Sequence, residues 1–202
     1  VGKGIMLPKD EEIENYLDAW NDYLTKNKKV LKFVPASGAA SRMFKDLFEY
    51  ADSDNCAETP AFISTFFSNI CSFAFYDELN EVCIKNNGKS VSELVESGEK
   101  KAVVRNLLSS EGLNYGNLPK GLLKFHSYSD GNRTPLEEHL VEGALYAAST
   151  DGKVNVHFTV SPEHKELFKQ KVEQKVEKYS KEYNVEYTVS FSEQKSSTDT
   201  VA

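Results

Sequence analysis

The 202-residue sequence has only three cysteines, no long apolar run and no excess of basic residues. Cys56, Cys71 and Cys83 are odd in number and lack C-x-x-C spacing, so neither a disulfide framework nor a zinc site is expected. This cysteine usage favours a reducing cytoplasm. No stretch approaches the ~20 apolar residues of a membrane-spanning helix, and no signal peptide is visible, so we expect no membrane partner.

Basic charge is scarce as well. The 24 lysines and arginines face 31 aspartates and glutamates, which gives a net charge of −7 at pH 7. A general attraction to nucleic acid is therefore not expected, and an anionic ligand would need a local basic site. The chain begins at Val1 without a methionine and stops at Ala202 as an apolar run starts. We expect a piece of a longer protein, with a core that is incomplete at the C-terminal end.

The first half of the sequence is predicted to be mainly helical. Apolar residues recur at helical spacing in 10–26, and a short apolar strand is expected at 30–34. Ser90 and Glu93 have the spacing of a capping box. Further helices are expected from residue 41, over 59–86 and over 90–112.

From residue 118 onward, strand and helix patterns alternate. Strands are expected at 120–128, 153–161 and 184–192, and helices at 134–150 and 162–183, with a tight turn at 130–132. This alternation predicts an α/β fold with a mostly parallel sheet covered by helices. We divide the chain into an N-terminal helical segment, 1–29, and an α/β core, 30–202, interrupted by a helical insertion at 47–117. The insertion's aromatic residues, at 62–76, are expected to form its own core.

A loop of small residues after the first expected strand is the leading candidate for a ligand site. It consists of Ala36, Ser37, Gly38, Ala39, Ala40 and Ser41, and Arg42 follows. In α/β sheets, ligands bind beyond the carboxyl ends of the strands, where backbone N–H groups favour a phosphate. An arginine there can make paired bonds to phosphate oxygens. The alternative is a tight turn with a solvated arginine, since the loop has neither the Walker A ending nor G-x-G-x-x-G spacing.

Two further motifs give this loop a context. LPKGLLKF places Pro119 and Lys120 before an expected strand, and TPLEEHLVEGA starts a helix. Together with VPASGAASRM, they resemble the opening signature of the sugar-phosphate nucleotidyltransferases, or pyrophosphorylases, of the nucleotide-diphospho-sugar transferase superfamily. VEYTVSFSEQ resembles a later strand of the UDP-sugar branch. The same segments resemble a bacterial family of unknown function within that superfamily. The resemblance covers 31–46 and 118–202.

The resemblance implies a three-layer α/β/α, Rossmann-like fold and a nucleotidyltransferase activity. A UTP-like nucleotide would be joined to a sugar phosphate, with release of pyrophosphate and with Mg²⁺ as cofactor; these two small molecules are the implied partners. The backbone of 36–41 would hold the base and the triphosphate, and Arg42 would contact the β- and γ-phosphates. Lys120 would neutralise charge as the sugar phosphate attacks, and Gln194 would contact the base.

The sequence departs from that family in three respects. Ala40 replaces a loop glycine, which could restrict the approach of a ligand to the backbone. Arg42 and Lys120 are separated by the insertion, whereas the family has them close in sequence. No counterpart of the metal-binding aspartate is apparent, because Asp199 lies too early, and the metal ligand is expected beyond residue 202.

Other candidates are weaker. The histidines, His126, His139, His157 and His164, lack metal-ligand spacing. His157 alternates with apolar residues and is expected to be packed rather than catalytic, whereas His126 could face the cleft. Two other functions remain open. One is a glycosyltransferase of related fold, and the other is a non-catalytic domain that binds a nucleotide or a nucleotide sugar.

Overall fold

The computed structural model describes residues 4–26, 28–53, 60–195 and 197. Its α-helices are α1 (Asp10–Thr25), α2 (Lys45–Asp52), α3 (Ala61–Ser68), α4 (Tyr76–Asn87), α5 (Val91–Glu96), α6 (Lys100–Leu108), α7 (Pro135–Tyr146) and α8 (Lys165–Tyr183). Short 3₁₀ helices are η1 (Ile70–Ser72), η2 (Lys120–Leu122) and η3 (Pro162–His164). The strands are β1 (Leu31–Pro35), β2 (His126–Tyr128), β3 (Gly131–Arg133), β4 (Lys153–Val160) and β5 (Glu186–Glu193).

A parallel sheet in the order β1-β4-β5 forms the centre of the α/β part. Val34 pairs with Phe158, and Phe158 pairs with Phe191, so one register runs across all three strands. In β4, every second side chain from Val154 to Val160 is buried, as expected for a strand with one face against a core. The structure therefore confirms a mixed α/β fold with a parallel sheet.

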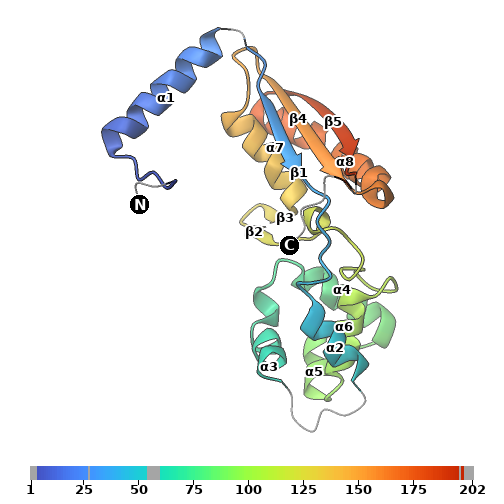
Figure 1. Ribbon diagram of the computed structural model, residues 1–202. Coiled ribbons are helices and arrows are strands. Elements are labelled where there is room, and N and C mark those ends of the chain that lie inside the picture. Colours follow the sequence, from blue (N-terminus) through green and yellow to red (C-terminus); the bar gives the residue numbers. More distant parts are fainter. Residues whose placement is uncertain (1–3, 27, 54–59, 196, 198–202) are drawn as a thin grey trace.

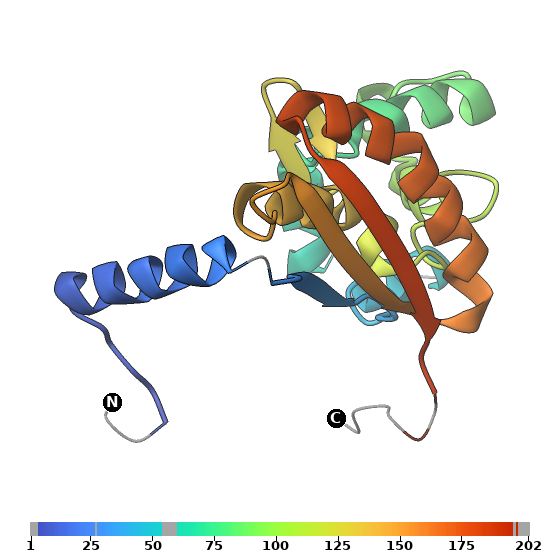
Figure 2. The ribbon, with the colours of Figure 1, turned by 90° about the horizontal axis from the view of Figure 1, so that it is seen from above.

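Helices α7 and α8 pack against one face of this sheet (Figures 1 and 2). Their side chains close a core with the inward residues of the strands: Val34, Leu136, Leu140, Val141, Val154, Val156, Phe158, Val160, Phe168, Val172 and Tyr179. On the opposite face, Leu31 and Phe33 are more than half exposed. The described residues thus form two layers, and the third layer that the sequence suggests stays a prediction.

Helices α2 to α6 form a separate helical unit at the end of the sheet toward which the strand arrows point (Figure 1). Its buried cluster begins at Ala40 and ends at Leu123, so it extends beyond the predicted insertion at 47–117 on both sides. Phe66, Phe67 and Phe75 are buried there, as the sequence analysis predicts for the aromatic residues of 62–76. Of that group, Phe62 and Phe73 are more exposed, at 46% and 37%.

Capping residues fix the helix starts where the sequence predicts them. The Thr134 hydroxyl accepts a hydrogen bond from the Glu137 N–H, and the Glu137 carboxylate accepts one from the Thr134 N–H. Pro135 occupies the first helical position of α7, where its missing N–H leaves no bond unmade. Ser90 and Glu93 form the second predicted capping box, at α5.

The strand predicted at 120–128 is wrong over its first half. Lys120 begins a 3₁₀ turn instead, and only His126–Tyr128 form a strand, β2, which pairs with β3 through the predicted turn. The reason is a tertiary contact at Gly121. A Cβ at this residue would lie only 2.9 Å from Cζ of the buried Phe168. The 3₁₀ turn therefore packs the glycine backbone directly against that ring.

Helix α1 is the predicted N-terminal helix, and it projects away from the rest of the chain (Figures 1 and 2). None of its side chains is buried. Among the residues that the structure describes, no helix is long and apolar enough to cross a membrane.

Candidate active site

The loop after β1 is tied to the Pro119-Lys120 segment by backbone contacts. The Lys120 N–H donates to the Gly38 carbonyl at 3.0 Å, and Ala39 and Pro119 form an isolated antiparallel bridge. Upstream, the Ala36 N–H donates to the Thr159 carbonyl at 2.7 Å and continues the pairing of β1 with β4. The loop and the Pro119-Lys120 segment, which precede and follow the helical unit in the sequence, therefore lie next to each other in the fold.

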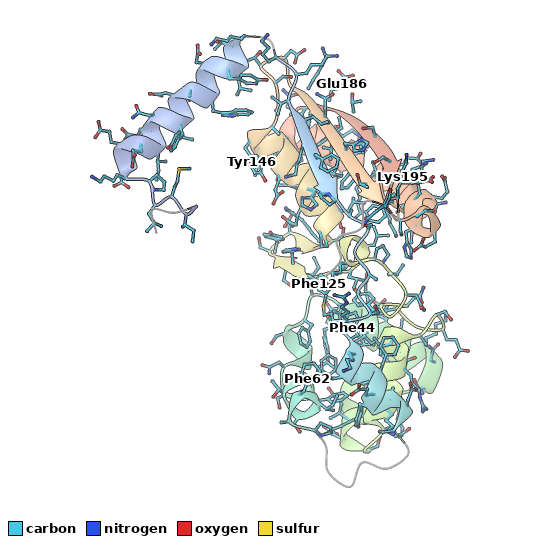
Figure 3. The ribbon with its side chains drawn as sticks, viewed as in Figure 1. Phe44, Phe62, Phe125, Tyr146, Glu186 and Lys195 are labelled. Carbon is cyan, nitrogen blue, oxygen red and sulfur yellow. The ribbon has the colours of Figure 1, made fainter. Side chains whose placement is uncertain are left out.

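Gln194 reaches the same loop from the end of β5. Its N–H donates to the Val160 carbonyl at 2.9 Å, which places it directly beyond the carboxyl end of the sheet. Its side-chain oxygen Oε1 accepts a hydrogen bond from the Ser37 hydroxyl. Figure 3 shows the next residue, Lys195, at the end of β5 opposite to Glu186. The loop, Lys120 and Gln194 thus meet at the edge of the sheet where ligands of α/β proteins bind.

Gly38 and Ala40, two of the small residues in the loop, differ in their surroundings. A Cβ at Gly38 would meet no atom within 4 Å, and the Gly38 backbone does not have a positive φ. Neither packing nor conformation therefore requires a glycine at this position. Ala40, in contrast, is 1% exposed and its methyl group belongs to the core of the helical unit. Its side chain points into the protein, so the methyl group of Ala40 does not cover the open surface at Gly38.

A cavity of about 190 Å³ lies beside the loop. Ala36, Gly38 and Lys120 line one side of it. The remaining lining is mostly apolar and comes from Pro35, Gly121, Pro135, Leu136, His139, Phe158 and Phe168. Lys120 and His139 are the two residues of this lining whose side chains can carry a positive charge.

Arg42 lies outside this cavity. It is exposed in the turn that precedes α2 and lines a shallow hollow with Ser41, Lys45, Phe48 and Glu49. Within the described part of the chain, its guanidinium has no hydrogen-bond or ion-pair partner. The structure therefore brings Lys120 and Gln194 to the loop but does not place Arg42 and Lys120 in one pocket.

His139 is a residue of the cavity that the sequence analysis does not select. Its Nδ1 lies 3.1 Å from Oε2 of Glu142, and the same oxygen accepts a bond of 2.6 Å from Lys32 Nζ. The spacing of His139 and Glu142, three residues apart on a predicted helix, is a signal that could have found the pair. Lys32 comes from β1, and nothing in the sequence predicts its contact with α7.

His157 and His126 do not line this cavity. His157 is half-buried and lies on the open face of the sheet rather than in the core, where its ring packs on Phe33 at 5.6 Å between centroids. Its ring nitrogens contact the hydroxyls of Ser190 and Ser192, both at 2.8 Å. His126 lies in the β2–β3 hairpin and is absent from the cavity lining.

Metal-binding clusters are missing from the part of the chain that the structure describes: it holds no group of three or more His, Cys, Asp or Glu side chains that could bind a metal ion. The described residues therefore do not fit a resident Mg²⁺ by themselves. Asp199, which lies too early in the sequence for the metal-binding aspartate of the resemblance, is outside the described residues.

Comparison with known families gives one match. The family model of a domain of unknown function, DUF4301, matches residues 1–202. The chain belongs to this family. Neither the curated proteins nor the solved structures contain a match to it. In this DUF4301 domain, the residues around Gly38 form the candidate site.

Proposed function

We propose that the loop after β1 binds a nucleotide and that the domain is a sugar-phosphate nucleotidyltransferase. The observation that carries this proposal is the open backbone at Gly38, together with the side chains gathered around it. Neither a neighbouring protein atom nor a positive φ requires a glycine at position 38. A ligand that lies against the backbone explains why this residue has no side chain. Lys120 adds a cation, and the Ser37–Gln194 pair adds a hydroxyl and an amide.

The proposed roles follow from position and chemistry. The backbone of 36–41 holds the base and the phosphates, and the amide of Gln194 contacts the base by hydrogen bonds. Lys120 neutralises negative charge on the phosphates, where positioning and charge stabilisation account for most of the catalysis in phosphoryl transfer. Arg42 is exposed and unpaired among the described residues, so its flexible side chain is available to reach the β- and γ-phosphates.

Mg²⁺ belongs to this proposal as an ion that arrives with the nucleotide. Its hard, oxygen-preferring chemistry suits phosphates, and in nucleotide enzymes it is commonly held by phosphate oxygens with one or two carboxylates. Because the described residues do not fit a resident site, we assign no step to the ion. The third layer of helices and the cytoplasmic location are further parts of the proposal.

Two alternatives share the same loop. A glycosyltransferase would use a finished nucleotide sugar and would transfer the sugar without releasing pyrophosphate from an NTP. A non-catalytic domain would bind the nucleotide or nucleotide sugar and turn nothing over. The outcome of one ligand panel separates all three.

The test is a thermal-shift panel with UTP, the other NTPs and several nucleotide sugars, each with and without Mg²⁺, followed by an assay of pyrophosphate release with sugar phosphates. Nucleotidyl transfer predicts stabilisation by an NTP and release of pyrophosphate. Stabilisation by a nucleotide sugar alone favours the glycosyltransferase, and binding without turnover favours the binding domain. A melting temperature that no nucleotide changes would contradict all three.

A further inference from the structure

His139 presents its imidazole to the cavity beside Gly38 and Lys120. The ring is held from two directions. Its Nδ1 contacts the Glu142 carboxylate at 3.1 Å, and its edge packs against the Phe158 ring at 6.4 Å between centroids. With Nδ1 directed at a carboxylate, that nitrogen carries a proton, and Nε2 is the nitrogen left for another partner.

Glu142 is held in its ionised form by its neighbours. Partial burial alone would raise its pKa, but hydrogen bonds from Lys32, His139 and Tyr146 bring the pKa to about 2. Lys32 itself is anchored: its side chain is 14% exposed, and its Nζ also contacts the Tyr146 hydroxyl at 3.2 Å. A fixed carboxylate therefore stands behind the imidazole on the side away from Nε2.

We propose that His139 binds a phosphate group of the ligand through Nε2, beside Lys120, and that Glu142 is the positioning residue that orients the ring. This inference rests on the proposed function, because it assigns one more contact in the same nucleotide site. When a phosphate binds and both ring nitrogens carry a proton, Nδ1–H is held by Glu142 and Nε2–H can donate a charge-assisted bond to a phosphate oxygen. The same arrangement gives no advantage toward an uncharged nucleoside.

The cavity chemistry favours an anion of small size at this point. About 190 Å³ bounded by the loop backbone and aromatic rings excludes a large substituent, and its two cation-capable side chains, Lys120 and His139, come from η2 and α7. The acidic group that faces the ring, Glu142, is neutralised by Lys32 from β1. The cavity lining itself contains no Asp or Glu side chain that would compete with an anion.

The experiment compares the affinities of UTP and uridine by calorimetry for the wild-type chain and three variants. His139→Ala removes the proposed phosphate contact, and His139→Gln replaces it by an amide donor of similar reach. His157→Ala is the matched control, because its ring lies on the open face of the sheet and outside the cavity. We expect His139→Ala to weaken UTP binding by about 10- to 100-fold, the usual effect of losing a hydrogen bond to a charged group.

The pattern across ligands and variants decides the inference. Uridine affinity is expected to be the same in all four proteins, UTP affinity to be unchanged in His157→Ala, and part of the loss to be recovered in His139→Gln. Equal UTP affinity in the wild type and His139→Ala would overturn the inference and leave the proposed function standing. A wild-type chain that binds neither UTP nor uridine would overturn both.

The role of Glu142 has its own readout. In ¹H–¹⁵N spectra of the imidazole rings, the His139 signals are identified by their loss in His139→Gln. We expect Nδ1 to carry the proton before UTP is added, and Nε2 to shift on addition. Glu142→Gln should change the Nδ1 signal and weaken UTP binding while the uridine affinity is retained. An unchanged ring spectrum in Glu142→Gln would remove Glu142 from the proposal.

Discussion

The hydroxyl of Ser37 donates a hydrogen bond to the side-chain oxygen of Gln194, and so joins the loop after β1 to the end of β5. The two strands lie on opposite edges of the sheet, with β4 between them. The contact spans the carboxyl ends of all three strands and defines the rim of the proposed nucleotide site. It also means that Ser37 and Gln194 hold each other in place, so a base that binds Gln194 meets an amide already oriented by the loop.

Replacement of Gly38 by alanine separates a structural role of this glycine from a ligand role. The added methyl group meets no protein atom within 4 Å and the backbone has no positive φ, so the melting temperature should be unchanged or slightly raised. If the loop backbone contacts the nucleotide, the same methyl group should weaken UTP binding by about 10-fold, or ~1.4 kcal/mol. Thermal melts and calorimetry on one preparation measure both effects. An unchanged affinity would mean that no ligand lies against Gly38.

Replacement of Arg42 or Lys120 by alanine should lower turnover without loss of stability. Both side chains are exposed, and neither makes an ion pair among the described residues. Removal of one group that stabilises transition-state charge lowers kcat by about 100-fold or more. The measurement is pyrophosphate release at saturating substrate, together with a thermal melt. Lys181→Ala, an exposed lysine on α8 that pairs with Glu177, is the control for a change in net charge. Normal turnover in both variants would remove the nucleotidyltransferase assignment.

Gly121→Ala should destabilise the protein, in contrast to Gly38→Ala. The new methyl group would lie 2.9 Å from Cζ of Phe168, a ring with no exposed surface. Overpacking of this kind costs about 1–3 kcal/mol of the free energy of unfolding. Urea unfolding of Gly121→Ala, Phe168→Leu and the double variant measures the coupling between the two residues. If the clash is the cause, the double variant loses less than the sum of the single variants.

Local patterns were sufficient to predict most elements of the α/β part. The β4 alternation and the Thr134–Glu137 capping box depend on neighbours in sequence, and both appear as expected. Gln194 and the loop were placed in one site from a resemblance, and the structure brings them together. The turn at Lys120 was not predictable in this way, because it depends on how Gly121 meets Phe168 in space.

The site itself was only partly predictable for a related reason. His139 was counted among histidines without metal-ligand spacing, although its surroundings come from a sheet strand, a helix and a loop. The partner that fixes Glu142 is Lys32, and no pattern within α7 points to β1. Long-range contacts of this kind decide which of several similar side chains enters a site. The spacing of residues along one helix or strand does not predict such contacts.

Glu137 gives a prediction for the dependence of stability on pH. It is 3% exposed, contacts Lys175 at 2.8 Å and accepts a hydrogen bond from the Tyr179 hydroxyl at 3.0 Å. Burial alone would raise its pKa, but these contacts and the Thr134 N–H hold the pKa below its ordinary value of 4.5. Because the pKa is lowered in the folded state, the stabilisation is fully present above pH 4.5 and is lost as the pH falls through the lower folded value.

The Glu137→Gln variant tests this dependence, because glutamine keeps the shape and one acceptor oxygen but removes the charge. Its NH2 group cannot accept a hydrogen bond, so the bonds to one of the two carboxylate oxygens are lost as well. At pH 7 we expect a loss of about 1–3 kcal/mol in the free energy of unfolding, as for a hydrogen bond between charged groups. Below pH 4.5 the difference between variant and wild type should shrink as the pH falls, since the carboxylate of the unfolded wild type then takes up a proton more readily than the folded one. Urea unfolding at several pH values measures it. Glu177→Gln, whose pair with Lys181 is exposed, should differ little from wild type at any pH. A Glu137→Gln difference that stays constant from pH 7 to pH 3 would show that the charge of Glu137 does not stabilise the fold.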